Sequence, residues 1–107
     1  MFSTKEIKAV KLLGGEVIIG MVTESFFSNS ILIEEAQQCI PQVVEDRMEV
    51  NLAPWLPFAR EYNFVVPKKQ IVTMFKVRPN LETNYKIATG NKRYGRFNES
   101  IREKIRR

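Results

Sequence analysis

The 107-residue sequence contains no histidine and only one cysteine, Cys39. Without histidine the chain lacks the usual general base near neutral pH and the commonest zinc ligand, and a lone cysteine has no imidazole to activate it. One cysteine also builds no disulfide framework, which is typical of a reducing cytoplasm, and Cys39 is expected to be a small buried apolar residue. We therefore expect a cytoplasmic, non-enzymatic protein with no metal and no cofactor.

Long apolar runs are absent as well. No stretch approaches the roughly 18 apolar residues of a membrane-spanning helix, and residues 1–6 are too polar for a secretory signal. Hydrophobic residues make up 44% of the sequence, which is enough for the core of one small domain. These features predict a single domain that does not enter a membrane.

Positive charge is concentrated at the C-terminal end. Residues 84–107 hold eight basic and two acidic side chains, whereas residues 1–83 hold nine basic and ten acidic ones. We expect a folded domain over residues 1–83 and a basic tail over residues 84–107 that is in part helical and is mobile or lightly docked. Such a tail either binds nucleic acid, with Arg93 and Arg96 as candidates, or is a solvated segment that keeps the protein in solution.

The rest of the sequence is patterned as short strands. Gly14 and Gly15 can adopt the positive φ of a tight hairpin turn. Gly20 lies within the strand that follows, where a glycine usually marks a bulge, a sharp bend or a close approach of two backbones. The five expected strands cover about residues 9–13, 16–26, 31–36, 62–66 and 71–77.

Five strands with short connections, one of them bent at a glycine, indicate an all-β fold. We expect a small, strongly bent antiparallel barrel of SH3-like size. Ser3 or Thr4 can cap a short N-terminal helix over residues 3–9, which would need to dock on the barrel because it is so short.

Residues 41–61 are less regular, and their three prolines are expected to interrupt strand pairing. A turn is indicated at residues 45–47, and alternating apolar residues favour a short strand over 48–52. Trp55 and Phe58 stand between prolines, either as anchors that pin the loop to the domain or as an exposed platform for a partner. Anchoring is the favoured interpretation.

The glycine pattern resembles the first Sm motif of the Sm and LSm (Hfq-like) proteins. Leu12, Gly15, Gly20 and Val22 stand where that motif has a leucine, a turn glycine, a strand glycine and an apolar residue. Ile31 falls at the apolar position of the third strand. The sequence is therefore identified as that of an Sm-like protein.

The resemblance covers about residues 7–78 and is to the Sm-like proteins of bacteriophages and marine viral sequences in particular. These share a Pro-Trp pair, here residues 54–55, and an apolar-Pro-Lys turn, here residues 66–68. The resemblance implies an N-terminal helix on a five-stranded bent sheet, in a homo-oligomeric ring of about five to seven subunits. If the protein is phage-encoded, it belongs in the host cytoplasm.

In such a ring, strand four of one subunit pairs with strand five of the next, so that the open sheet edges are covered. The interface residues implied by this arrangement are Tyr62, Phe64, Val66, Ile71, Thr73 and Phe75.

The RNA pocket of the family does not carry over. Where the family has an Asp and an Asn after the strand glycine, this chain has Phe26 and Ser30, and residues 67–68 are Pro-Lys instead of Arg-Gly. The Tyr-Lys-His core of the Hfq branch is also absent. These replacements weaken the inference that the protein binds the family's RNA ligand more than they weaken the inference of an Sm-like fold.

Other residues offer contacts for nucleic acid. Phe26 and Phe27, at the end of the second strand, can stack on a base, although adjacent strand residues point to opposite faces and one is expected to be buried. Lys68 and Lys69 precede the last strand, where a ring would repeat them around its pore and they would hold phosphates; otherwise they are solvated turn residues. The predicted function is non-enzymatic binding of RNA or other single-stranded nucleic acid. The alternative is a structural or regulatory protein-interaction ring that binds no RNA.

Overall fold

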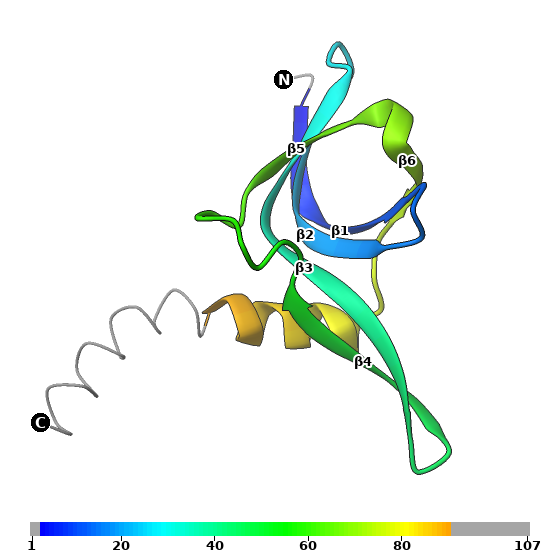
Figure 1. Ribbon diagram of the computed structural model, residues 1–107. Coiled ribbons are helices and arrows are strands. Elements are labelled where there is room, and N and C mark those ends of the chain that lie inside the picture. The colour runs from blue at the N-terminus through cyan, green and yellow to red at the C-terminus, as the bar shows by residue number, and fades with distance from the viewer. Residues whose placement is uncertain (1–2, 91–107) are drawn as a thin grey trace, which may run out of the picture.

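The computed structural model describes residues 3–90, which form mainly antiparallel strands (Figure 1). One helix covers residues 79–90, and a short 3-10 turn, η1 (Lys68–Gln70), precedes the last strand. The predicted all-β class is confirmed. The six strands of this part of the chain are β1 (Ser3–Leu12), β2 (Val17–Ser25), β3 (Ser30–Val44), β4 (Arg47–Pro54), β5 (Phe64–Pro67) and β6 (Ile71–Phe75).

All six strands belong to one sheet, in the order β4-β3-β2-β1-β6, with β5 paired to β3. The long strand β3 pairs with β2 and with two further strands, because residues 30–33 also pair with β5 and residues 37–44 also pair with β4. β1 pairs with β2 along its length and with β6 through residues 9–12. The sheet curls around its core (Figure 1), but within residues 3–90 it stays open, since β5 and β6 do not pair with each other.

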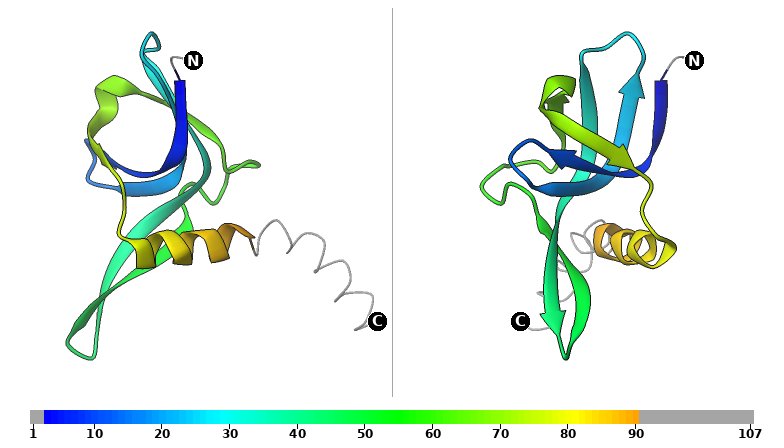
Figure 2. Two further views of the ribbon diagram at one scale, coloured as in Figure 1. Left: turned by 180° about the vertical axis from the view of Figure 1, so that it is seen from behind. Right: turned by 90° about the vertical axis from the view of Figure 1, so that its right-hand side faces the viewer.

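Both faces of the sheet are buried near its sharpest curve. Ile18 belongs to the core inside the curl, and its neighbour Ile19, on the opposite face, is equally buried. Helix 79–90 lies across that outer face (Figure 2). The core consists of Val10, Leu12, Ile18, Val22, Ile31, Ile33, Ala36 and Val66.

Gly20 permits the close approach of β2 to β3. Between the pairs Met21–Glu34 and Ile19–Gln37, β3 carries one residue more than β2, so a β-bulge forms opposite the glycine. A Cβ atom on Gly20 would lie 2.8 Å from the Glu34 carbonyl oxygen and would also collide with a methyl group of the adjacent core isoleucine. The bend predicted from this glycine is therefore a bulge, in which glycine is required by space.

The bulge is hydrogen-bonded to two other parts of the chain, the loop before β5 and the helix. Glu35, at φ 54°, donates its backbone N–H to Asn63 Oδ1 at 3.0 Å, and the Ala36 N–H donates to the Tyr62 carbonyl at 2.8 Å. The Tyr85 hydroxyl on the helix is 2.9 Å from the Glu35 carbonyl oxygen, to which it donates. The loop before β5 and the helix are thus both attached where β3 deviates from regular pairing.

The helix begins at Pro79, shortly after β6 ends at Phe75. Pro79 stands in its first turn, a position that needs no backbone donor. Tyr85 and Thr89 are buried, so the light docking expected from residue 84 onward is wrong for residues 84–90. Within the described range no helix has the length and apolar character needed to cross a membrane.

The predicted N-terminal helix over residues 3–9 is wrong, because these residues lie in β1. They pair with β2 from Ser3 to Lys11, and the Lys8 ammonium lies 3.2 Å from the Glu24 carboxylate across the two strands. Pairing along a whole strand outweighs the weak helix signal of so short a segment.

The predicted interruption by proline is wrong for Pro41, which lies within β3 opposite Val50. Within residues 3–90, β4 is the one strand that pairs with β3 at this position, so a residue without an N–H group is tolerated at the outer edge. The two strands form an arm, residues 40–51, that projects from the sheet (Figure 1) and is exposed throughout. The turn expected at its tip is confirmed, with Glu45 and Asp46 at φ 50° and 64°.

The bulge gives a stability prediction. Gly20→Ala should lower the free energy of unfolding by about 1–3 kcal/mol, because the added methyl group meets backbone that cannot move without breaking the bulge. Gly90→Ala is the matched control, since no atom lies within 4 Å of the Cβ position there. Urea denaturation at one fixed chain concentration measures both, and equal stability of the two variants would contradict the role given to Gly20.

Candidate nucleic-acid interface

The turn between β2 and β3 is attached to η1 at one end of the sheet. The Lys68 backbone N–H donates to the Asn29 carbonyl at 2.8 Å, and the Lys68 ammonium donates to the Ser25 carbonyl, also at 2.8 Å. Both segments lie at the end of the molecule away from the arm (Figure 1). The structure thus brings together two segments that the sequence offered separately as candidates for binding nucleic acid.

Phe26 and Phe27 are both exposed, at 82% and 74% of their surface. Their ring centroids are 5.3 Å apart and the rings are nearly perpendicular, at 84°. The expectation that one of them is buried is wrong, because β2 ends at Ser25 and the alternation of a strand no longer applies in the turn. The turn therefore presents an aromatic pair to solvent, as a base-stacking surface requires.

The two lysines have different environments. Lys68 is half-buried and its ammonium is used to hold the β2–β3 turn, whereas Lys69 is exposed. Lys69 is therefore the better placed of the two to contact a phosphate. The sequence did not indicate the structural role of Lys68, since it depends on a carbonyl 43 residues away.

The residues expected at a subunit interface divide between the core and the surface. Val66 is buried in the core, and Phe64 and Ile71 pack against it, whereas Thr73 and Phe75 are exposed. Tyr62 lies just before β5 and is half-buried. Two exposed apolar residues of these strands were not among the predicted interface residues: Val65 is 69% exposed and Val72 is 55% exposed. Strict alternation along β5 would have placed Val65 on the opposite face of the strand from the buried Val66.

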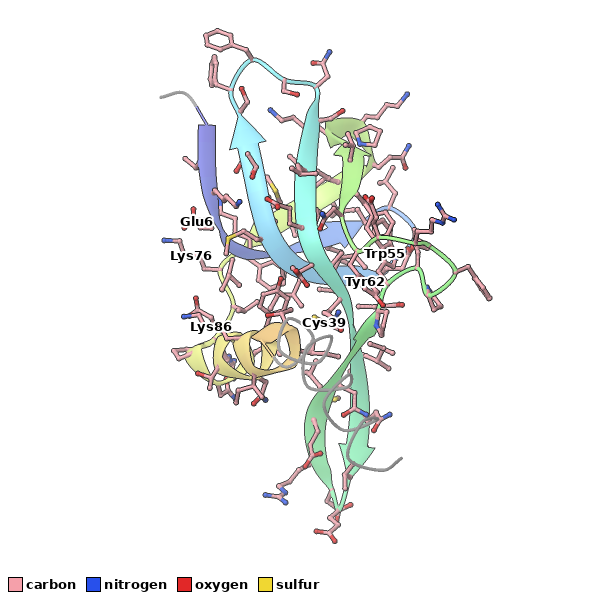
Figure 3. All side chains as sticks on the ribbon, turned by 90° about the vertical axis from the view of Figure 1, so that its left-hand side faces the viewer. Glu6, Cys39, Trp55, Tyr62, Lys76 and Lys86 are labelled. Carbon is pink, nitrogen blue, oxygen red and sulfur yellow. The ribbon has the colours of Figure 1, made fainter. Side chains whose placement is uncertain are left out.

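Trp55 and Phe58 also differ in their placement. Trp55 packs against the core and meets Phe64 edge to face, with ring centroids 5.2 Å apart. Phe58 is completely exposed. The favoured interpretation, anchoring, is confirmed for Trp55 at the base of the loop (Figure 3) and wrong for Phe58, which lies in solvent.

Arg93 and Arg96, the candidates in the basic tail, lie outside the described residues.

A row of charged side chains joins β1, β2 and the residue that follows β6. The hydrogen bond from Lys8 lowers the pKa of Glu6, and the hydrogen bond to Glu24 raises the pKa of Lys8. Lys76 lies 3.6 Å from Glu6 (Figure 3). Glu6 thus stabilises the fold above the ordinary carboxyl pKa and loses this effect on acidification, while Lys8 stabilises it below pH 10.5 and loses this effect in stronger base. Each carboxylate has a cation beside it, so the row is a structural network on the surface.

Cys39 is half-buried in β3, and burial raises the pKa of its thiol to about 11. Residues 3–90 contain no group of three acidic, histidine or cysteine side chains placed to hold a metal ion. The thiol is protonated at neutral pH and is therefore a poor nucleophile.

The thiol gives a second prediction. At about pH 8, iodoacetamide should alkylate Cys39 in the folded protein roughly ten to a hundred times more slowly than in the unfolded chain, because little thiolate is present. Mass spectrometry with and without denaturant measures the two rates. Equal rates would show that the side chain is not desolvated as described.

A scan against protein-family models finds no match to this chain, and a search of curated proteins finds none either. The fold of residues 3–90 defines the class by itself: it is an all-β protein with one strongly bent, open antiparallel sheet.

Proposed function

We propose that this protein is a cytoplasmic, Sm-like ring protein that binds RNA or other single-stranded nucleic acid without catalysing a reaction. The observation that carries the proposal is the exposed pair Phe26 and Phe27, in a turn that the two hydrogen bonds of Lys68 join to η1, the segment that also holds the exposed Lys69. Stacking on aromatic rings and contacts from a nearby cation to phosphate are the two ways in which proteins bind single strands with little sequence preference.

The open edges of the sheet support ring formation. Within residues 3–90, β5 pairs with β3 alone and β6 with β1 alone, so each has an outer edge of unsatisfied backbone groups. Val65 and Val72 expose apolar side chains on these edge strands. Pairing of β5 with β6 of the next copy satisfies both edges and generates a head-to-tail contact that can close into a ring. The Sm-like proteins that the sequence resembles would form such a ring.

A protein-interaction ring that binds no RNA is the second candidate. Phe26 and Ser30 replace the acidic and amide residues of the family pocket, and one of the two lysines expected at the pore, Lys68, is occupied by the Ser25 carbonyl. Neither observation removes the aromatic pair, so nucleic-acid binding remains the first choice.

Light scattering coupled to size-exclusion chromatography tests the ring. We expect a mass of about five to seven chains, the ring size that the resemblance to Sm-like proteins implies, and the two edges of each subunit allow such a head-to-tail assembly to close. A monomer at micromolar concentration would contradict the ring.

Fluorescence titration with labelled single-stranded RNA and DNA, at low and moderate salt, tests the interface. Replacing Phe26 and Phe27 by alanine should weaken binding by roughly fivefold or more, because each stacked base contributes about 1–3 kcal/mol. Val43→Ala, which removes an equally exposed apolar side chain from the arm, is the control. Lys69→Ala should reduce the salt dependence of binding, whereas Lys86→Ala, on the exposed side of the helix, should not.

The outcomes separate the candidates. A wild-type ring that binds no nucleic acid at low salt would contradict the first proposal and favour the interaction ring. Normal binding by the Phe26, Phe27 and Lys69 variants, together with loss of binding on removal of residues 91–107, would contradict this interface and assign binding to the basic tail.

A further inference from the structure

A groove of about 910 Å³ lies between the arm, the residues that follow β6, and helix 79–90. Figure 2 shows the arm and the helix diverging below the curled sheet. The groove is open to solvent, and Met48 and Phe75 in its walls are 68% and 44% exposed. Its apolar lining consists of Met48, Val50, Phe75, Val77 and Leu81.

A loop elsewhere in the described part of the chain presents apolar side chains to solvent. Phe58 is fully exposed and Leu56 is 43% exposed, although both stand in a loop whose base is fixed by Trp55. The Ala59 N–H donates to the Leu56 carbonyl at 3.0 Å, so the tip is a defined turn. Holding a phenylalanine in water in this way costs free energy unless another surface covers it.

The proposed ring brings this loop and this groove together. Antiparallel pairing of β5 with β6 of the next copy places the residues before Phe64 beside the residues after Phe75. Phe58 is six positions before Phe64, and Leu81 is six positions after Phe75. The loop of one subunit therefore extends along its neighbour to the groove, as a continuation of the paired edges.

Both surfaces carry charged side chains. Lys76 and Arg78 line the groove at the end of β6, and Glu49 lines it on the arm. The loop carries Arg60 and Glu61 directly after its apolar tip. One acidic and one basic side chain thus lie on the loop, and the groove offers Arg78 and Glu49 to pair with them, because Lys76 already lies beside Glu6.

We propose that the groove binds the 56–58 loop of an adjacent copy of this chain, with the partner subunit's Phe58 as the buried anchor. This inference rests on the proposed ring and adds a contact specific to this sequence. Aromatic side chains that fill a pocket at an interface commonly dominate its stability. The loop and the groove form a second contact beside the paired strands.

Photo-crosslinking tests the contact directly. Phe58 is replaced by p-benzoylphenylalanine, which the full exposure of the position accommodates, in assemblies mixed from light and heavy-isotope-labelled chains. We expect crosslinks between chains, to residues 48–51 or 75–81. Crosslinks within one chain, to any other surface, or none at all would overturn the proposal.

Phe58→Ser gives the energetic test, with Leu13→Ser, also exposed, as its control. The Phe58 variant should fold normally by circular dichroism but require a roughly tenfold or higher chain concentration to assemble, while the control assembles as wild type. Unchanged assembly of Phe58→Ser would overturn the groove contact while leaving the ring and its nucleic-acid binding intact. A monomeric wild-type protein would overturn the ring and the groove contact together.

Discussion

The close approach of β2 to β3 at Gly20 is the constraint on which the rest of the structure depends. Because no side chain stands between the two strands there, β3 can carry an extra residue and turn its Glu34 and Glu35 carbonyls outward. Those carbonyls accept from Tyr85 on the helix, and the adjoining N–H groups of β3 donate to the loop before β5. A single backbone irregularity therefore fixes the helix, the loop and the start of an edge strand.

The same bulge separates two regions of different character. On one side of it, β3 pairs with β5 and closes around the core, and the β2–β3 turn carries the aromatic pair. On the other side, residues 37–38 of β3 still pair with both β2 and β4, and the residues of β3 after them pair, within residues 3–90, with β4 alone, as an arm without a core of its own. Two strands alone are marginally stable in water. The proposed assembly gives each region a partner, nucleic acid at the turn and a neighbouring subunit in the groove beside the arm.

Particular residues show how far the sequence could be interpreted. The turn at Gly15 and the irregularity at Gly20 were predictable, since each rests on a local requirement that only glycine meets. The start of β1 and the pairing of Pro41 were not, because both depend on a distant strand that provides partners or leaves an edge free. For the candidate site, the exposure of the side chains was not predicted: Phe26 and Phe27 are both exposed because β2 ends one residue earlier than expected.

The sequence by itself determined the all-β class, the hairpin, the special backbone at Gly20 and the surplus of positive charge in residues 84–107, since these follow from local geometry and composition. Only the tertiary structure decided that Lys68 holds the turn while Lys69 remains exposed, and that Trp55 is an anchor while Phe58 is not. The physical reason is the same in each case. Whether a side chain is used for packing or left exposed depends on which distant backbone comes within a few ångströms of it.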